Sequence, residues 1–205
     1  MQGTDQTHFA EGNIMKIVCY GDSNTYGWDP SYFSGNHYAH PWPERMAQIT
    51  GNKVVNCGEP GRVLPFRKEY LEWFCRDVRA NAPDLLVIML GTNDLFYASE
   101  STADAVAARM KEMICCAIQN QLAEKILLLS CPHVLLMDSR VMAVLEEISE
   151  RYRRIAEEEG IGFADAFRWD IPLAFDGVHF TEDGHRVFAE KISSVITEKY
   201  QTTGV

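Results

Sequence analysis

The chain of 205 residues is long enough for one domain with a sizeable core, and its hydrophobic content of 46% and aromatic content of 11% indicate a globular protein. The formal net charge of −10 at pH 7 argues against nucleic acid or an anionic membrane as a main partner, because both bind basic surfaces. No apolar run in the sequence reaches the length of a membrane-spanning helix.

The N-terminal segment differs in character from the rest of the chain. Residues 1–14 are predicted to be a disordered extension, and residues 15–205 a single domain. The extension is polar and lacks the apolar segment of a secretion signal, so we expect a cytoplasmic protein. In that compartment cysteines are expected to be reduced thiols that pack as small hydrophobes. The six cysteines, none in a CxxC pair, are Cys19, Cys57, Cys75, Cys115, Cys116 and Cys131.

Short apolar runs alternate with amphipathic segments along the domain. The runs predicted as strands are Ile14–Tyr20, Lys53–Cys57, Leu85–Leu90, Lys125–Ser130 and Ile161–Ala164. Helical spacing predicts helices over Trp42–Ile49, Phe66–Asn81, Thr102–Gln121, Met137–Glu159 and Thr181–Tyr200. This alternation predicts an α/β fold, with a five-stranded parallel sheet and helices on both faces. Ligands of such sheets bind at the carboxyl ends of the strands, so functional residues are expected in the loops that follow them.

The first of these loops carries GDSNTYG, residues 21–27. A serine in a glycine-flanked turn after a strand is well placed to present its hydroxyl and a free backbone N–H, so Ser23 is a candidate nucleophile. Two other interpretations stay open for this motif alone. It is also typical of a turn with a helix cap, and of a phosphate-binding loop like that of flavodoxins.

Three further motifs follow later strands or precede the last helix. NCGEPGR (residues 56–62) has glycines that permit close backbone approach, although an ordinary turn would explain it too. GTND (residues 91–94) places Asn93 where its amide could donate to a developing oxyanion, or merely form an Asx turn. DGVHFTEDGH (residues 176–185) brings Asp176 within three residues of His179, so that a turn would bring the carboxylate to the imidazole. His185, further along, is expected to be structural.

Together the four motifs resemble the SGNH (GDSL-like) hydrolase family, whose named residues are a Ser, a Gly, an Asn and a His in four such blocks. The matching positions are Ser23, Gly58, Asn93 and His179, with Asp176 at the acid position. The resemblance spans nearly the whole domain and implies a flavodoxin-like, three-layer α/β/α sandwich. The stretches GDSNTYGW, NCGEPGR and MLGTND are similar to the arylesterase-like and acyltransferase-like branch. Asn24 stands where the family name has Leu, and we expect that difference to affect specificity, not chemistry.

The resemblance implies a serine esterase that cleaves small carboxylic esters without a metal or organic cofactor. His179 would take the proton of Ser23, whose oxygen attacks the carbonyl, and Asp176 would orient His179. The expected oxyanion donors are the backbone N–H groups of Ser23 and Gly58 and the side chain of Asn93.

Several residues near the predicted strand ends are candidates for substrate contact. We expect Trp28, Arg62 and Phe96 to contribute, although Arg62 could equally pair with a surface acid and Trp42 could equally be core. Two histidines of the first loop, His37 and His40, lack a companion ligand at suitable spacing, so no metal is expected. The same aromatic-rich loop could instead form a homo-oligomer surface or a lid.

Other functions remain open at the level of sequence. The same triad would serve a carbohydrate O-acetyl esterase, a thioesterase or a lysophospholipase. A non-enzyme alternative is a flavodoxin-like binding module, against which the Asp176–His179 pair argues, because a flavin site does not require it.

Overall fold

A parallel sheet forms the centre of the protein. The computed structural model describes residues 14–31, 36–97, 102–135 and 139–201. In these residues the strands are β1 (Lys16–Gly21), β2 (Lys53–Gly58), β3 (Leu85–Met89), β4 (Lys125–Leu129) and β5 (Gly162–Ala164). They lie in the order β2-β1-β3-β4-β5, and every pairing is parallel. The prediction of a five-stranded parallel sheet is therefore confirmed.

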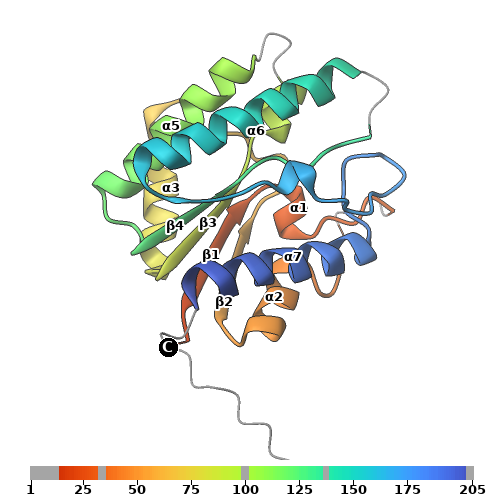
Figure 1. Cartoon of the computed structure of the whole chain (residues 1–205), viewed down its shortest axis with the longest axis horizontal. Coiled ribbons are helices and arrows are strands. Elements are labelled where there is room, and N and C mark those ends of the chain that lie inside the picture. Colours follow the sequence, from red (N-terminus) through yellow and green to blue (C-terminus); the bar gives the residue numbers. More distant parts are fainter. Residues whose placement is uncertain (1–13, 32–35, 98–101, 136–138, 202–205) are drawn as a thin grey trace, which may run out of the picture.

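Two apolar layers cover the two faces of the sheet, because successive side chains of a strand point to opposite sides. In β1, Val18 and Tyr20 belong to one core, and Ile17 and Cys19 to the other. The first face is covered by α3 (Lys68–Asn81), α5 (Ala103–Gln119) and α6 (Ser139–Glu159). The second is covered by α2 (Trp42–Thr50) and α7 (Glu182–Tyr200) (Figure 1). This is the three-layer α/β/α sandwich that the resemblance implied.

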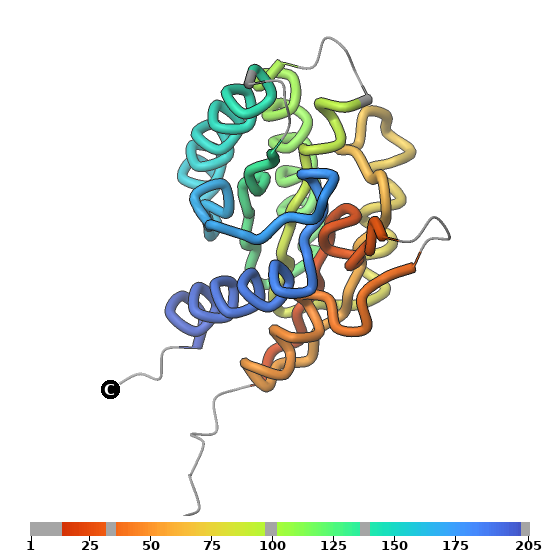
Figure 2. The backbone as a smooth tube through the Cα atoms, turned by 90° about the vertical axis from the view of Figure 1, so that its right-hand side faces the viewer, coloured from red at the N-terminus to blue at the C-terminus, as the bar shows by residue number. Residues whose placement is uncertain are grey.

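The carboxyl ends of the central strands lie level with one another. Gly21 of β1 pairs with Gly58 of β2 and with Met89 of β3. Two short helices, α1 (Ser23–Tyr26) and α4 (Thr92–Tyr97), begin within a few residues of β1 and β3. Figure 2 shows the segment that precedes α7 passing beside α1. Residues far apart in the sequence therefore meet at this edge.

Most element boundaries agree with the sequence to within a few residues. Thr102 is the N-cap of α5, since its Oγ1 accepts a hydrogen bond of 3.2 Å from the N–H of Ala105. The helix predicted from Phe66 begins only at Lys68. The start of the helix predicted from Met137, and the predicted extension up to residue 13, lie outside the described residues. Among the described helices, none is both long and apolar enough to cross a membrane.

Candidate active site

Ser23 lies at the start of α1, directly beyond the end of β1. The helix begins there because Asp22 is its N-cap: the Asp22 carboxylate accepts the N–H of Asn24 at 3.0 Å. Ser23 is the first helical residue, so its backbone N–H has no acceptor within the helix. This N–H also meets no other acceptor in the described residues. The serine is 7% exposed, so its hydroxyl lies in a largely dehydrated position.

Ser23, His179 and Asp176 form a continuous chain of hydrogen bonds. Ser23 Oγ lies 3.0 Å from His179 Nε2, and His179 Nδ1 lies 2.6 Å from Asp176 Oδ2. The other carboxylate oxygen of Asp176 accepts the N–H groups of Val178 and His179, each at 3.0 Å. Since an ionised carboxylate only accepts, the proton lies on Nδ1, and Nε2 is free to accept the serine hydroxyl. This arrangement brings together the three residues that the sequence predicted as a triad.

Two carboxyl groups near this chain have opposite pKa shifts. Burial pushes the pKa of Asp176 upward, but hydrogen bonds from the His179 ring and from the N–H groups of Val178 and His179 outweigh it and hold the pKa below its ordinary value. Asp22 is fully buried, and the loss of hydration raises its pKa to about 6, against the opposing effects of the Asn24 N–H and of His179. Asp176 is therefore ionised throughout the neutral range, whereas Asp22 titrates just below it.

Asn24 joins the first motif to the histidine loop. Its Nδ2 donates to the carbonyl of Val178 at 3.1 Å, and its Oδ1 accepts the N–H of Phe180 at 2.9 Å. The two backbone partners lie on either side of His179. Asn24 is only 6% exposed, so these bonds are shielded from water. The sequence analysis did not find this connection, because its partners are more than 150 residues away.

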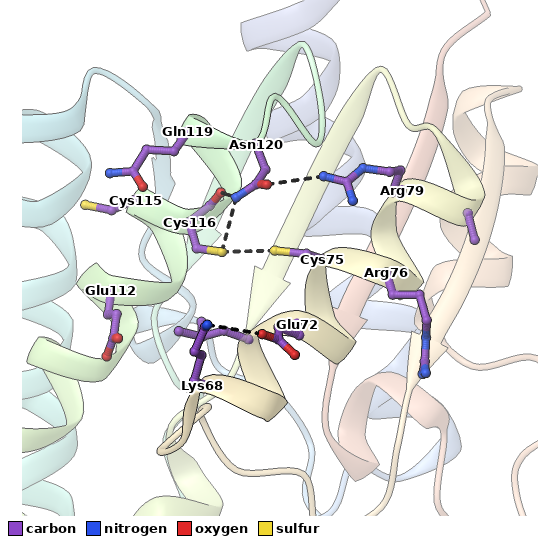
Figure 3. Close-up of a pocket in the computed structure, with 12 residues that line it drawn as sticks. Lys68, Glu72, Cys75, Arg76, Arg79, Glu112, Cys115, Cys116, Gln119 and Asn120 are labelled. Carbon is purple, nitrogen blue, oxygen red and sulfur yellow. Dashed lines mark hydrogen bonds and ion pairs between the residues drawn. The ribbon is translucent and has the colours of Figure 1, made fainter.

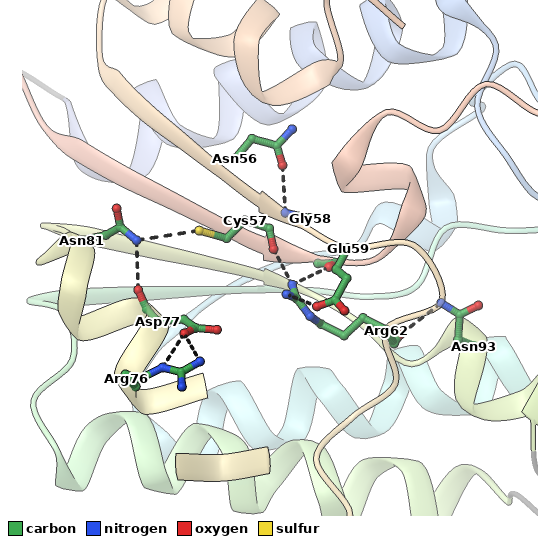
Figure 4. A network of polar contacts seen from close by, with 10 residues as sticks. Asn56, Cys57, Gly58, Glu59, Arg62, Arg76, Asp77, Asn81 and Asn93 are labelled. Atoms are coloured by element: carbon green, nitrogen blue, oxygen red, sulfur yellow. Dashed lines mark hydrogen bonds and ion pairs between the residues drawn. The ribbon is translucent and has the colours of Figure 1, made fainter. Parts of the chain in front are cut away.

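The candidate oxyanion donors differ in their availability. Asn93, the second residue of α4, donates one N–H to the carbonyl of Arg62 at 3.0 Å (Figure 4), which leaves its second N–H available. The Gly58 N–H, by contrast, donates to Asn56 Oδ1 at 2.9 Å. A Cβ on Gly58 would lie 2.1 Å from the nitrogen of Tyr26, so the absence of a side chain lets β2 pack against α1. Gly61, with a φ of 74°, has an N–H without an acceptor in the described residues, and sequence reasoning missed it.

The side chain of Arg62 connects the carboxyl ends of β1 and β2 through hydrogen bonds. Its guanidinium donates to the carbonyls of Gly21, at 2.8 Å, and of Cys57, and pairs with Glu59 at 2.8 Å (Figure 4). The guanidinium also lies 4.0 Å from the centre of the Tyr20 ring. The pairing with an acid is thus observed, and Arg62 also lines a pocket of about 360 Å³, so the two interpretations that the sequence left open are compatible.

The other aromatic residues and histidines that the sequence singled out lie near the candidate triad, at the surface or in the core. The Trp28 ring centre lies 6.5 Å from that of His179, so Trp28 lies beside the candidate triad, whereas Phe96 in α4 is 40% exposed. Trp42 is fully buried against Phe188, which makes it a core residue. His185 is also buried: its Nδ1 faces the N–H of Trp42, and burial lowers its pKa to about 3.

Two exposed apolar side chains near the histidine loop were not predicted. Phe175, beside Asp176, is 82% exposed, and Leu135 is 69% exposed. Leu135 is tied to the loop through its N–H, which donates to the carbonyl of Gly177 at 2.7 Å. In the first loop, the backbones of His37 and Trp28 pair in a single antiparallel β-bridge. His40 Nδ1 lies 3.5 Å from Glu44 Oε2.

A hydrogen-bonded serine, histidine and aspartate at the carboxyl edge of a parallel sheet is an arrangement that serine hydrolases share. The model of the GDSL-like Lipase/Acylhydrolase family matches residues 19–187. The chain belongs to this family, and the resemblance noted from its motifs is thereby confirmed.

Solved structures share the fold at low sequence identity. The native aryl esterase of M. smegmatis is 22% identical, with a TM-score of 0.77 over 89% of this chain and 98% of that one. A putative arylesterase from Agrobacterium tumefaciens str. C58 is 22% identical, with a TM-score of 0.77 over 90% and 99%. A carbohydrate acetylesterase family member from Sinorhizobium meliloti is 23% identical, with a TM-score of 0.75 over 90% and 98%. A search of curated proteins gives no match.

Proposed function

We propose that the protein is a serine esterase that cleaves small carboxylic esters through an acyl-enzyme intermediate. The observation that chiefly supports this is the unbroken chain from Ser23 Oγ through His179 to Asp176, with bonds of 3.0 and 2.6 Å. A base within hydrogen-bond reach of a hydroxyl, itself oriented by a carboxylate, is what nucleophilic catalysis by serine requires.

In the proposed first step His179 Nε2 takes the proton of Ser23 as Oγ attacks the ester carbonyl. The imidazolium that forms is stabilised by the ionised Asp176. The carbonyl oxygen becomes an oxyanion, held by the backbone N–H of Ser23 and the second N–H of Asn93. A third donor comes from the loop after β2. Gly58 would serve only if its bond to Asn56 broke, whereas the Gly61 N–H is already free of other acceptors in the described residues.

In the second half of the cycle the proton returns and water enters. His179 protonates the departing alcohol, then takes a proton from water, which attacks the acyl group on Ser23 and releases the acid. Arg62 acts in this proposal as a brace of the loops after β1 and β2, not as a substrate ligand, because its donors meet protein carbonyls and Glu59. Trp28, Phe96 and the exposed Phe175 are proposed to contact the acyl or aryl group.

The test is hydrolysis of p-nitrophenyl esters from acetyl to dodecanoyl, with Ser23→Ala as the matched variant. We expect the wild type to cleave short esters and the variant to lose cleavage. Equal rates for the two proteins would mean either that Ser23 is not the nucleophile or that these esters do not resemble the substrate. Labelling with a fluorophosphonate then separates a wrong nucleophile from an unsuitable ester, since a reactive serine is labelled whatever its natural substrate.

A sugar ester is the second candidate substrate, and one observation favours it. Phe66, Tyr70 and Trp73 form a chain of rings with centres 4.9 and 5.0 Å apart, and the outer two rings are about half exposed. They line a pocket of about 360 Å³ together with Gly61 and Arg62 of the loop after β2. Flat aromatic faces beside charged groups suit the apolar faces and hydroxyls of a sugar.

Trp73→Ala separates the two candidates. If the physiological substrate is an acetylated sugar, the substitution raises KM for acetylated xylosides while leaving p-nitrophenyl acetate hydrolysis unchanged. An equal effect on both substrates would count against a sugar site at these rings.

A further inference from the structure

A second group of reactive side chains lies on the helical face remote from α2 and α7. A groove of about 780 Å³ runs between α3 and α5. Cys75 of α3 and Cys116 of α5 face each other across it, and Arg79 and Asn120 lie beside them (Figure 3). None of the residues proposed for ester cleavage lines this groove.

The two sulfur atoms are close enough to react with each other. Cys75 Sγ and Cys116 Sγ lie 2.9 Å apart. A disulfide bond is about 2.05 Å long, so bond formation requires an approach of less than an ångström. The neighbouring Cys115 points away from the pair (Figure 3) and interacts with Glu159 and Lys111 instead. The chain thus offers a paired and an unpaired cysteine at adjacent positions.

The surroundings give the two thiols different roles. Cys75 is only 8% exposed, and burial, together with Cys116, raises its pKa to about 12, so it remains a thiol at neutral pH. Cys116 is partly exposed to the groove. Asn120 Nδ2 donates to its sulfur at 3.6 Å, and Arg79 holds Asn120 through a bond of 3.3 Å to its Oδ1. Cys116 is the more exposed of the two thiols, so a reagent in the groove meets it first, and it is therefore the attacking group.

We propose that Cys75 and Cys116 form a reversible dithiol–disulfide site that reacts with low-molecular-weight disulfides such as glutathione disulfide. The Cys116 thiolate attacks one sulfur of the reagent, which forms a mixed disulfide and releases one thiol. Cys75 then loses its proton and attacks Cys116 Sγ, which releases the second thiol. Two protein thiols are oxidised to one protein disulfide, and one reagent disulfide is reduced to two thiols.

The bond would connect two helices that are separate in sequence. Cys75 and Cys116 lie 41 residues apart, so their disulfide closes a long loop and restricts the unfolded chain. It joins α3, which follows the loop that carries Gly61 and Arg62, to α5, which follows α4 and Asn93. We therefore expect the oxidised protein to melt several degrees higher than the reduced protein.

The test treats the full-length protein with mixtures of oxidised and reduced glutathione and identifies the product by mass spectrometry of a non-reduced tryptic digest. Oxidation should lower the six free thiols by two and join the peptide 69–76 to the peptide 112–125. Reduction by dithiothreitol should restore the free thiols and the lower melting temperature.

Single substitutions assign the bond, because the second peptide contains both Cys115 and Cys116. Cys115→Ser should still form the linked peptide, and Cys116→Ser should not. Cys75→Ser should stop at one glutathione adduct on Cys116. The proposal is overturned if the linked peptide persists in Cys116→Ser, if Cys115→Ser abolishes it, or if all six thiols survive conditions that oxidise a reference dithiol. Ester hydrolysis plays no part in this readout.

Discussion

Replacing Asn24 by Leu tests how firmly the histidine loop depends on the first motif. The substitution conserves approximate size but removes both bonds of Asn24, to the carbonyl of Val178 and the N–H of Phe180. These bonds position the backbone on either side of His179. The loop would lose two of the hydrogen bonds that attach it to α1, which carries Ser23.

The expected cost follows from what the two backbone groups lose. A buried group left without a hydrogen-bond partner costs about 1–3 kcal/mol. Phe180 is fully buried, so its N–H has no access to water, whereas Val178 is only partly buried and its carbonyl can recover hydration. We therefore expect the free energy of unfolding to fall by about 3 kcal/mol. A displacement of His179 by about 1 Å would lower kcat by about 100-fold.

The assay pairs urea unfolding with steady-state kinetics on a short p-nitrophenyl ester. Asn24→Asp is the companion variant, since it keeps an acceptor for the N–H of Phe180 but replaces the donor to the Val178 carbonyl by a second acceptor. Gln119→Leu, an exposed amide-to-leucine change on α5, is the control. The reasoning is refuted if Asn24→Leu unfolds at the wild-type urea concentration with unchanged kcat. A rise in KM alone would restore the sequence-based expectation that this position affects specificity.

Three further substitutions probe the electrostatics of the site. Asp176→Asn should lower kcat by about 10⁴, because an amide no longer fixes the Nδ1–H tautomer of His179; a loss under tenfold would contradict its proposed role. Asn93→Ala should lower kcat by about 10²–10³ with little change in KM, and an effect on KM alone would argue against an oxyanion donor. Asp22→Asn should raise the free energy of unfolding at pH 7 by up to about 3 kcal/mol, because the pKa of the wild-type carboxyl is raised to about 6. That gain should shrink as pH falls from about 6 to 4, since the folded wild type binds a proton before the unfolded chain does; urea titrations across this range measure it.

The sheet and its long helices could be predicted because their hydrophobic patterns are local. Leu85–Met89 is a continuous apolar run buried on both faces, as a central parallel strand requires. The short helices α1 and α4 have too few residues to show a period, and their sequences are also typical of turns. Their positions follow from the strand ends they adjoin, not from their own composition.

The candidate triad could be predicted because its motifs carry distinctive residue types, whereas the bonds around it could not. Whether the Gly58 N–H is free depends on the side chain of Asn56, two residues away, and nothing in the motif reveals that orientation. Besides Glu59, the partners of Arg62 are backbone carbonyls, which exist at every position and leave no trace in the sequence. From the sequence, Trp42 suited a substrate pocket and the core equally well. It is a core residue because α2 packs on α7, which places Trp42 against Phe188.

The groups proposed to react come from both ends of the described fold. Ser23 and His179 are 156 residues apart, and α2, near the start, packs against α7, the last helix. His179, the proposed base, lies just before α7. A chain that has formed the sheet but has not yet docked α7 would therefore not hold His179 beside Ser23. During refolding, the proposed ester hydrolysis would then appear only when the histidine loop and α7 have docked. It would appear later than the optical signal that follows formation of the sheet.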